Sequence, residues 1–115
     1  MTAYKICVVG GWCGNRMVMV AEYLAEVLSQ SGYTCQVRHH SIWENFSAPP
    51  RSHLVLQLLP AFTEADTGCP VISIRPLLRD LNHPETLAAI LGRVRTDYPA
   101  VTGRRVPAAG LEAVA

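Results

Sequence analysis

The first third of the chain places a short apolar run directly before a segment with helical spacing. Residues 5–9 are mainly apolar and end in a glycine pair, and residues 16–31 carry apolar side chains that fall on one helical face. That face consists of Met17, Val20, Ala21, Leu24, Val27 and Leu28. Asn15 is a suitable N-cap, and Gly32 is a suitable stop. The pattern predicts a strand at 5–9 and a helix at 16–31.

Three further segments have the lengths and boundaries of strands. Residues 33–39 alternate between apolar and polar side chains, residues 52–59 are mainly apolar, and residues 71–74 lie between two prolines. Residues 60–69 are few and polar, so we expect at most a single helical turn there. A strand, a helix and a second strand in this order favour a right-handed crossover, and hence a parallel sheet with helices on its faces. The predicted fold class is α/β.

A second helix is predicted to start near Pro84. Asn82 or His83 would lie near its cap, and Glu85 gives its first turn an acidic residue. The apolar face would consist of Leu87, Ile90, Leu91 and Val94. The chain from residue 98 onward contains prolines and glycines without sustained periodicity. We therefore expect one domain over residues 1–97 and a flexible tail or linker over residues 98–115.

Composition narrows the function classes. The chain has 115 residues, half of them hydrophobic, and a formal net charge of +1, so it lacks the basic footprint of a nucleic-acid-binding protein. Its apolar runs are shorter than the roughly 20 residues that cross a bilayer, and no secretory signal opens the sequence. We expect a cytoplasmic protein with no direct membrane insertion. The four cysteines form no CxxC pair and no zinc-ligand spacing, so no metal or cofactor is predicted and the thiols are expected to be reduced.

The candidate chemistry lies in the loop between the first strand and the first helix. Residues 10–16 read Gly-Gly-Trp-Cys-Gly-Asn-Arg. Glycines let backbone N–H groups turn inward, and the following helix start adds unpaired donors and the positive end of its dipole, so the loop is a candidate phosphate cradle. A thiol at Cys13, beside a helix start and Arg16, is expected to be nucleophilic, and Arg16 would pair with phosphoryl oxygens. The alternative is a plain tight turn with an ordinary surface thiol.

These segments resemble the enzyme IIB components of the bacterial sugar phosphotransferase system, in particular the galactitol- and ascorbate-type branch. The resemblance covers residues 4–96. It rests on Lys5-Ile6-Cys7-Val8-Val9 before a glycine-rich loop, on Met17-Val18-Met19-Val20-Ala21-Glu22, on His53–Leu59, on Pro70–Ile74 and on the closing helix. It implies a single-domain, three-layer α/β/α sandwich with a four-stranded parallel sheet. It also implies a phosphocarrier that takes phosphate from IIA on a cysteine and passes it to a sugar or sugar alcohol held by the membrane permease IIC.

The position that should carry the family's phosphocysteine is Gly10, or Gly11 if the loop is one residue shorter. The loop's only thiol is Cys13, which the resemblance therefore assigns as the catalytic residue. Gly10, Gly11, Trp12, Gly14, Asn15 and Arg16 are then the expected phosphate-binding residues. The family's usual hydroxyl side chains are missing from the loop.

Other readings stay open. A IIB-like domain without an acceptor would be a binding or regulatory module. Low-molecular-weight tyrosine phosphatases share the architecture, but their general acid could be sought only at Asp66 or Asp80. A thiol redox protein would need a resolving cysteine, which Trp12-Cys13-Gly14 lacks.

Several polar or aromatic residues outside the loop have ambiguous roles. His39, His40 and His53 match no strong motif and are interpreted as polar residues at the sheet edge. Arg75 and Arg79 follow the fourth strand, on the same side as the glycine loop if the sheet is parallel, where they would bind an acidic ligand or partner. Ile42, Trp43 and Phe46 are expected to cap the sheet, unless an exposed aromatic ring there docks a partner.

Overall fold

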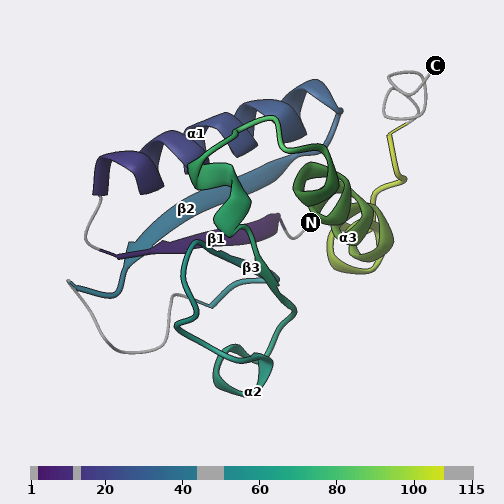
Figure 1. Cartoon of the computed structure of the whole chain (residues 1–115). Helices are drawn as coiled ribbons and strands as arrows, with labels where there is room; N and C mark the ends of the chain where they lie inside the picture. Colours follow the sequence, from purple (N-terminus) through teal and green to yellow (C-terminus); the bar gives the residue numbers. More distant parts are fainter. Residues whose placement is uncertain (1–2, 12–13, 44–50, 108–115) are drawn as a thin grey trace.

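The computed structural model describes residues 3–11, 14–43 and 51–107. Its central feature is a four-stranded parallel sheet with the strand order β2-β1-β3-β4. Figure 1 labels the first three of these strands. The elements are β1 (Tyr4–Gly10), α1 (Gly14–Gln30), β2 (Cys35–Ser41), β3 (Leu54–Gln57), α2 (Glu64–Thr67), β4 (Val71–Ser73), the 3₁₀ helix η1 (Arg75–Leu78) and α3 (Pro84–Thr102). The predicted α/β class and parallel sheet are confirmed.

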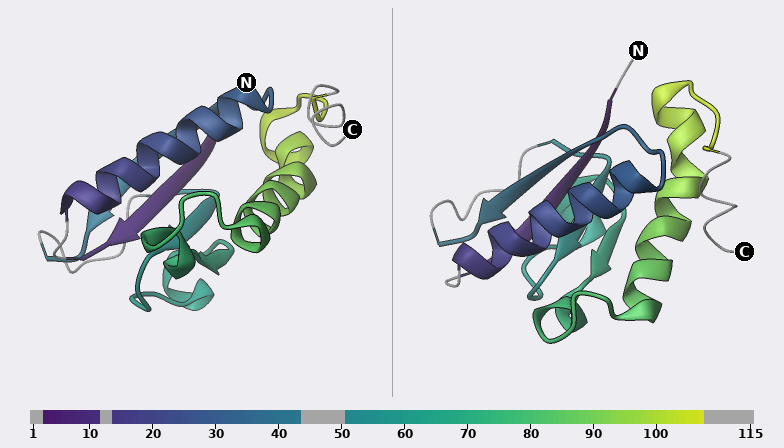
Figure 2. Two further views of the ribbon diagram at one scale, coloured as in Figure 1. Left: turned by 45° about the horizontal axis from the view of Figure 1, so that its top comes forward. Right: turned by 90° about the horizontal axis from the view of Figure 1, so that it is seen from above.

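The main core lies on one face of the sheet. β1 is central and pairs with both β2 and β3, so that Ile6 aligns with Leu54 and Val8 aligns with Leu56. The two long helices, α1 and α3, pack their apolar faces on these residues through Leu24 and Ile90, among others. Figure 2 shows both helices on the same side of the sheet when it is seen from above. Within the described residues, no helix is long and apolar enough to cross a membrane.

The opposite face has a thinner cover than the predicted sandwich requires. Cys7, Val9 and Val55 form a small second core there, and loop residues such as Phe62 and Cys69 pack against it. The helix on this side, α2, has four residues, none of them buried (Figure 1). Among the described residues, the third layer is therefore a single helical turn with loops.

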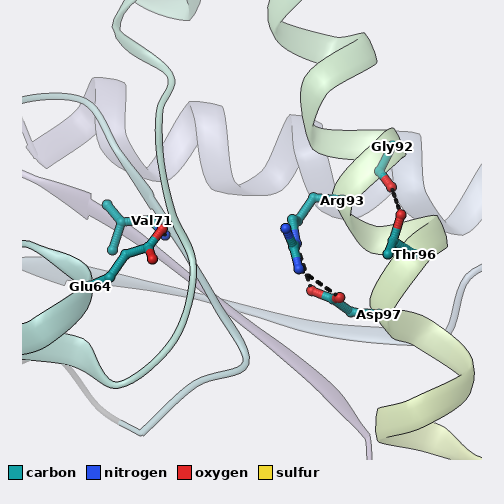
Figure 3. Close-up of polar contacts among 6 residues, drawn as sticks. All are labelled: Glu64, Val71, Gly92, Arg93, Thr96 and Asp97. Carbon is teal, nitrogen blue, oxygen red and sulfur yellow. Dashed lines mark hydrogen bonds and ion pairs between the residues drawn. The ribbon is translucent and has the colours of Figure 1, made fainter.

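Local hydrogen bonds hold the short α2 turn in place. Thr63 and Asp66 form a capping box, in which the Thr63 side chain accepts from the Asp66 N–H and the Asp66 carboxylate accepts from the Thr63 N–H. Gly68 ends the turn with a φ of 69°, and Glu64 Oε2 accepts from the Val71 N–H at 3.4 Å (Figure 3). The single turn expected in residues 60–69 is confirmed, and it is tied to the start of β4.

Helix boundaries differ from the predicted ones at two places. α1 starts at Gly14, so Asn15 lies in its first turn and is not the N-cap. α3 is capped by His83, as predicted, but it continues to Thr102 and ends at Gly103, which has a φ of 72°. The helix therefore runs across residue 97, where the sequence predicted the domain to end.

The extension of α3 has a packing cause. Tyr98 is 2% exposed, its ring meets Tyr33 edge-to-face at 4.9 Å, and its hydroxyl accepts a hydrogen bond from the Thr34 N–H at 3.0 Å. A proline inside a helix costs roughly 3 kcal/mol, and Pro99 is such a residue. Burial of a large aromatic side chain offsets that cost. Residues 108–115, the rest of the predicted tail, lie outside the described residues.

Candidate functional site

Gly10 ends β1 at the carboxyl edge of the sheet, where the resemblance places the phosphocysteine. A Cβ atom on Gly10 would lie 2.8 Å from Met17 Sδ, 2.9 Å from Met17 Cγ and 3.0 Å from Met17 Cβ. Contacts this short require Met17, a core residue of α1, to shift. Gly10 is therefore a packing position beneath α1, and it presents no open space for a side chain.

Gly11, the residue after β1, lies close to side chains from two other segments. A Cβ atom on Gly11 would lie 2.8 Å from Leu59 Cδ2 and 3.1 Å from Trp43 Nε1. The absence of a side chain lets the backbone of the loop approach Leu59, which follows β3. Neither glycine can be replaced by a nucleophilic residue without moving a neighbouring side chain.

Arg16 lies in the first turn of α1 and reaches to the 3₁₀ helix η1. Its Nη1 donates a hydrogen bond to the carbonyl oxygen of Leu78 at 2.8 Å. This bond joins two segments that are 62 residues apart in the sequence. Because guanidinium carries five N–H donors, one bond to a carbonyl leaves donors that can serve a ligand.

Arg16 and Arg75 line a common pocket of about 620 Å³, which also includes Gly11 and the first-turn residue Met17. The remaining lining residues are the apolar Leu58, Leu59 and Leu78. No acidic side chain is among the described lining residues, so the charge of this pocket is positive. The first turn of α1 adds the positive end of a 17-residue helix and contains no acidic residue. We call this the Gly11 pocket.

Arg79 belongs to a neighbouring cavity. That cavity, of about 310 Å³, lies between α1 and η1 and shares Arg16 with the Gly11 pocket. The exposed Met19 also lines it. The prediction that Arg75 and Arg79 lie on the side of the glycine loop is confirmed, but only Arg75 enters the same pocket as Gly11.

The structure thus brings together some of the predicted phosphate-binding residues and separates others. Gly11 and Arg16 line the pocket, whereas Gly10 lies under Met17. Asn15 is exposed on the first turn of α1 and does not line the pocket. Gly14 is the first residue of α1. Trp12 and the candidate nucleophile Cys13 lie outside the described residues.

Two other cysteines have the properties of structural residues. Burial, with a smaller contribution from the nearby Cys69, raises the pKa of Cys7 to about 11. Burial also raises the pKa of Cys35 to about 11. Both thiols are protonated at neutral pH, and a protonated thiol is a poor nucleophile. Cys7 in β1 and Cys35 in β2 therefore act as small apolar side chains of their strands.

The two aspartates considered as general acids do not line the Gly11 pocket, although Asp80 lines a neighbouring cavity with Arg75. Asp66 lies at the α2 cap, where hydrogen bonds from the Thr63 backbone and side chain lower its pKa. A general acid needs the opposite shift, because it must hold a proton near neutral pH. Asp80 Oδ1 accepts from the Asn82 N–H at 2.9 Å. Among the described residues, neither aspartate lines the pocket, so neither is placed as the acid that the phosphatase alternative needs.

Two features of the site were not found from the sequence. The Leu78 carbonyl that holds Arg16 is a backbone group, and the leucines that form the pocket wall have no chemical signature. The one available signal was Pro76 after Arg75, since proline favours the first turn of a helix and here lies in the first turn of η1. In the part of the chain that the structure describes, no three His, Cys, Asp or Glu residues are grouped so that they could hold a metal ion.

Comparison with known proteins adds no assignment. No protein-family model matches the chain, and searches of curated proteins and of solved structures also found no match.

Proposed function

We propose that this chain is a IIB-like phosphocarrier, which accepts a phosphoryl group from a IIA protein on Cys13 and passes it to a sugar held by IIC. The observation that supports the proposal most is the meeting of Arg16 and Arg75 in one pocket with Gly11. Two cationic side chains without an acidic neighbour in the described lining of that pocket would balance a phosphoryl dianion. Cys13 follows Gly11 after one residue and directly precedes α1.

The proposed chemistry consists of two displacements at phosphorus. The Cys13 thiolate attacks the phosphorus of an N-phosphohistidine, so that an S–P bond forms, the N–P bond breaks and the imidazole nitrogen of IIA takes up a proton. A sugar hydroxyl then attacks the same phosphorus, the S–P bond breaks, and the hydroxyl proton leaves to a base on the permease or to water. Arg16 and Arg75 would stabilise the charge on the phosphoryl oxygens in both steps.

The test is phosphorylation of the full chain by phosphoenolpyruvate, the general phosphotransferase proteins and a candidate IIA. Intact-mass measurement and peptide mapping should find phosphate on the peptide that contains Cys13, and Cys13→Ser should abolish it. Arg75→Gln should slow the transfer about tenfold or more through loss of one charge-assisted contact. Arg104→Gln, an exposed arginine outside the Gly11 pocket, is the matched control and should leave the rate unchanged.

A second candidate function is a IIB-like regulatory domain that binds a phosphorylated partner and accepts nothing. The packing of Met17 on Gly10 favours it, because the strand-end position of the nucleophile is closed. In that case phospho-IIA would bind in an Arg75-dependent way while the mass of this chain stayed unchanged. Phosphate on the Cys13 peptide would exclude this candidate.

A further inference from the structure

A second polar cavity lies at the amino edge of the sheet. It has a volume of about 370 Å³ and is lined by Lys5, Arg51, Ser52, His53, Thr67 and Gly68. These residues come from the start of β1, from the segment before β3 and from the end of α2. The cavity and the Gly11 pocket share no lining residue, and Lys5 and Gly11 are separated by the length of β1, about 20 Å at roughly 3.3 Å per residue. We call it the amino-edge pocket.

The charge of the amino-edge pocket is not balanced within the described part of the chain. Lys5 and Arg51 are exposed, and no aspartate or glutamate is among the described residues that line the cavity. The ion pair found in the described ranges is Arg93 with Asp97 on α3 (Figure 3), and neither Lys5 nor Arg51 takes part in it. Two cationic side chains, Lys5 and Arg51, thus border one small cavity. Neither forms an ion pair with a carboxylate of the described residues.

His53 adds a donor of fixed orientation. The Lys5 N–H donates to His53 Nδ1 at 3.0 Å, and the His53 N–H donates to the Lys5 carbonyl oxygen at 2.8 Å. The imidazole ring also lies 5.7 Å from the ring of the buried Tyr4. Because Nδ1 accepts a hydrogen bond, the neutral ring carries its proton on Nε2. His53 is therefore held as an Nε2–H donor, and it is one of the residues that line the pocket.

We propose that the amino-edge pocket binds the phosphoryl group of a small phosphate monoester. Lys5 and Arg51 match the two negative charges of such a group, and His53 Nε2–H supplies a third hydrogen bond to its oxygens. Small-molecule sites have volumes of about 300–1,000 Å³, so the cavity has room for an organic group beside the phosphoryl oxygens. This proposal does not depend on the phosphocarrier function.

The sequence provides a selective probe for this site, because Lys5 is its only lysine. Acylation of the Lys5 amine in the full chain, followed by mass spectrometry, measures how well a ligand protects it. Glycerol 3-phosphate is expected to slow the acylation, and Arg51→Gln is expected to weaken this protection about tenfold, as the loss of one charge-assisted contact would. Arg104→Gln and Arg75→Gln are the matched controls. In both variants, glycerol 3-phosphate should protect Lys5 from acylation as well as it does in the wild type.

Three outcomes would overturn the proposal. If potassium chloride at the same ionic strength slowed the acylation of Lys5 equally, the effect of glycerol 3-phosphate would be charge screening and not binding. Protection that persists unchanged in Arg51→Gln would show that the phosphoryl group binds elsewhere. Equal protection by inorganic phosphate and by glycerol 3-phosphate would show that the ester's organic group makes no contact. Circular dichroism of Arg51→Gln checks that the variant is folded, which its exposed position leads us to expect.

Discussion

Met17 lies so close to Gly10 that a Cβ atom on the glycine would come within 2.8 Å of the Met17 sulfur. One residue ends β1 and the other begins the buried face of α1, so this contact sets how closely the helix approaches the strand. A phosphocysteine at this strand end needs space for Cβ and Sγ. Here the thioether of Met17 fills that space, and the sequence carries its loop thiol three residues later, at Cys13.

The first prediction concerns restoration of the strand-end cysteine. Gly10→Cys should lower the free energy of unfolding by about 1–3 kcal/mol, because its side chain overpacks against Met17. Urea denaturation measures the change. The double variant Gly10→Cys with Met17→Ala should be more stable than the sum of the two single changes predicts, since the alanine frees the space. Additive effects in this double-mutant cycle would show that the two side chains do not compete.

The second prediction concerns Gln57, a buried amide at the end of β3. Its Oε1 accepts from the N–H groups of Ala61 and Phe62, and its Nε2 donates to the Phe62 carbonyl oxygen at 3.1 Å. Gln57→Leu would leave these backbone groups without partners, at a cost of about 3 kcal/mol in unfolding free energy. The matched control is Gln36→Leu on the exposed side of β2, which should change stability by less than about 0.5 kcal/mol. Similar effects of both changes would contradict the prediction.

The third prediction is a loss of stability in alkali that depends on Cys7. Its pKa rises from 9.0 to about 11 on folding. Between pH 9 and pH 11 the unfolded thiol loses its proton while the folded thiol keeps it, so the folded state binds more protons and becomes less stable as the pH rises. The effect of this thiol is about 2 kcal/mol over that range.

Urea unfolding of the wild type and of Cys7→Ala across this pH range tests the third prediction. The variant should be less stable at pH 8, because a buried side chain is truncated, but its stability should fall less steeply above pH 9. Equal slopes would mean that Cys7 titrates alike in the folded and the unfolded chain.

The fourth prediction concerns the end of the domain. A chain that stops after residue 97, the boundary predicted from the sequence, lacks Tyr98 and should be less stable by about 3–5 kcal/mol than a chain of residues 1–107. The loss combines the buried ring with the acceptor for the Thr34 N–H. Thermal or urea unfolding of the two chains measures the difference. Equal stability would show that the last turn of α3 contributes nothing to the core.

The sequence predicted the order and type of the main elements because local physics carries that information. The apolar face of residues 17–28, the glycine stop at Gly32 and the N-cap at His83 depend on neighbours within a few residues of the chain. The glycine-rich loop before α1 could be located in the same way. Arg75 was placed on the correct side because strands of a parallel sheet end at one edge.

What the sequence did not determine depends on contacts between distant segments. A helix at Pro99 is unfavourable locally, and the burial of Tyr98 beside Tyr4 and Tyr33 and of Thr102 carries α3 past it. That Met17 fills the space beside Gly10 could be seen only once the position of Met17 in three dimensions was known.

By itself, then, the sequence determined a parallel α/β domain with a candidate anion loop, because hydrophobic periodicity and glycine chemistry act over short distances. Only the tertiary structure decided that both long helices share one face of the sheet and that Arg16 and Arg75 enter one pocket. The tertiary structure also decided that Lys5, Arg51 and His53 border a second cavity, the amino-edge pocket. The two pockets follow from the pairing of β1 with β3 and from the contact of η1 with α1. The spacing of residues along the chain does not encode these contacts directly.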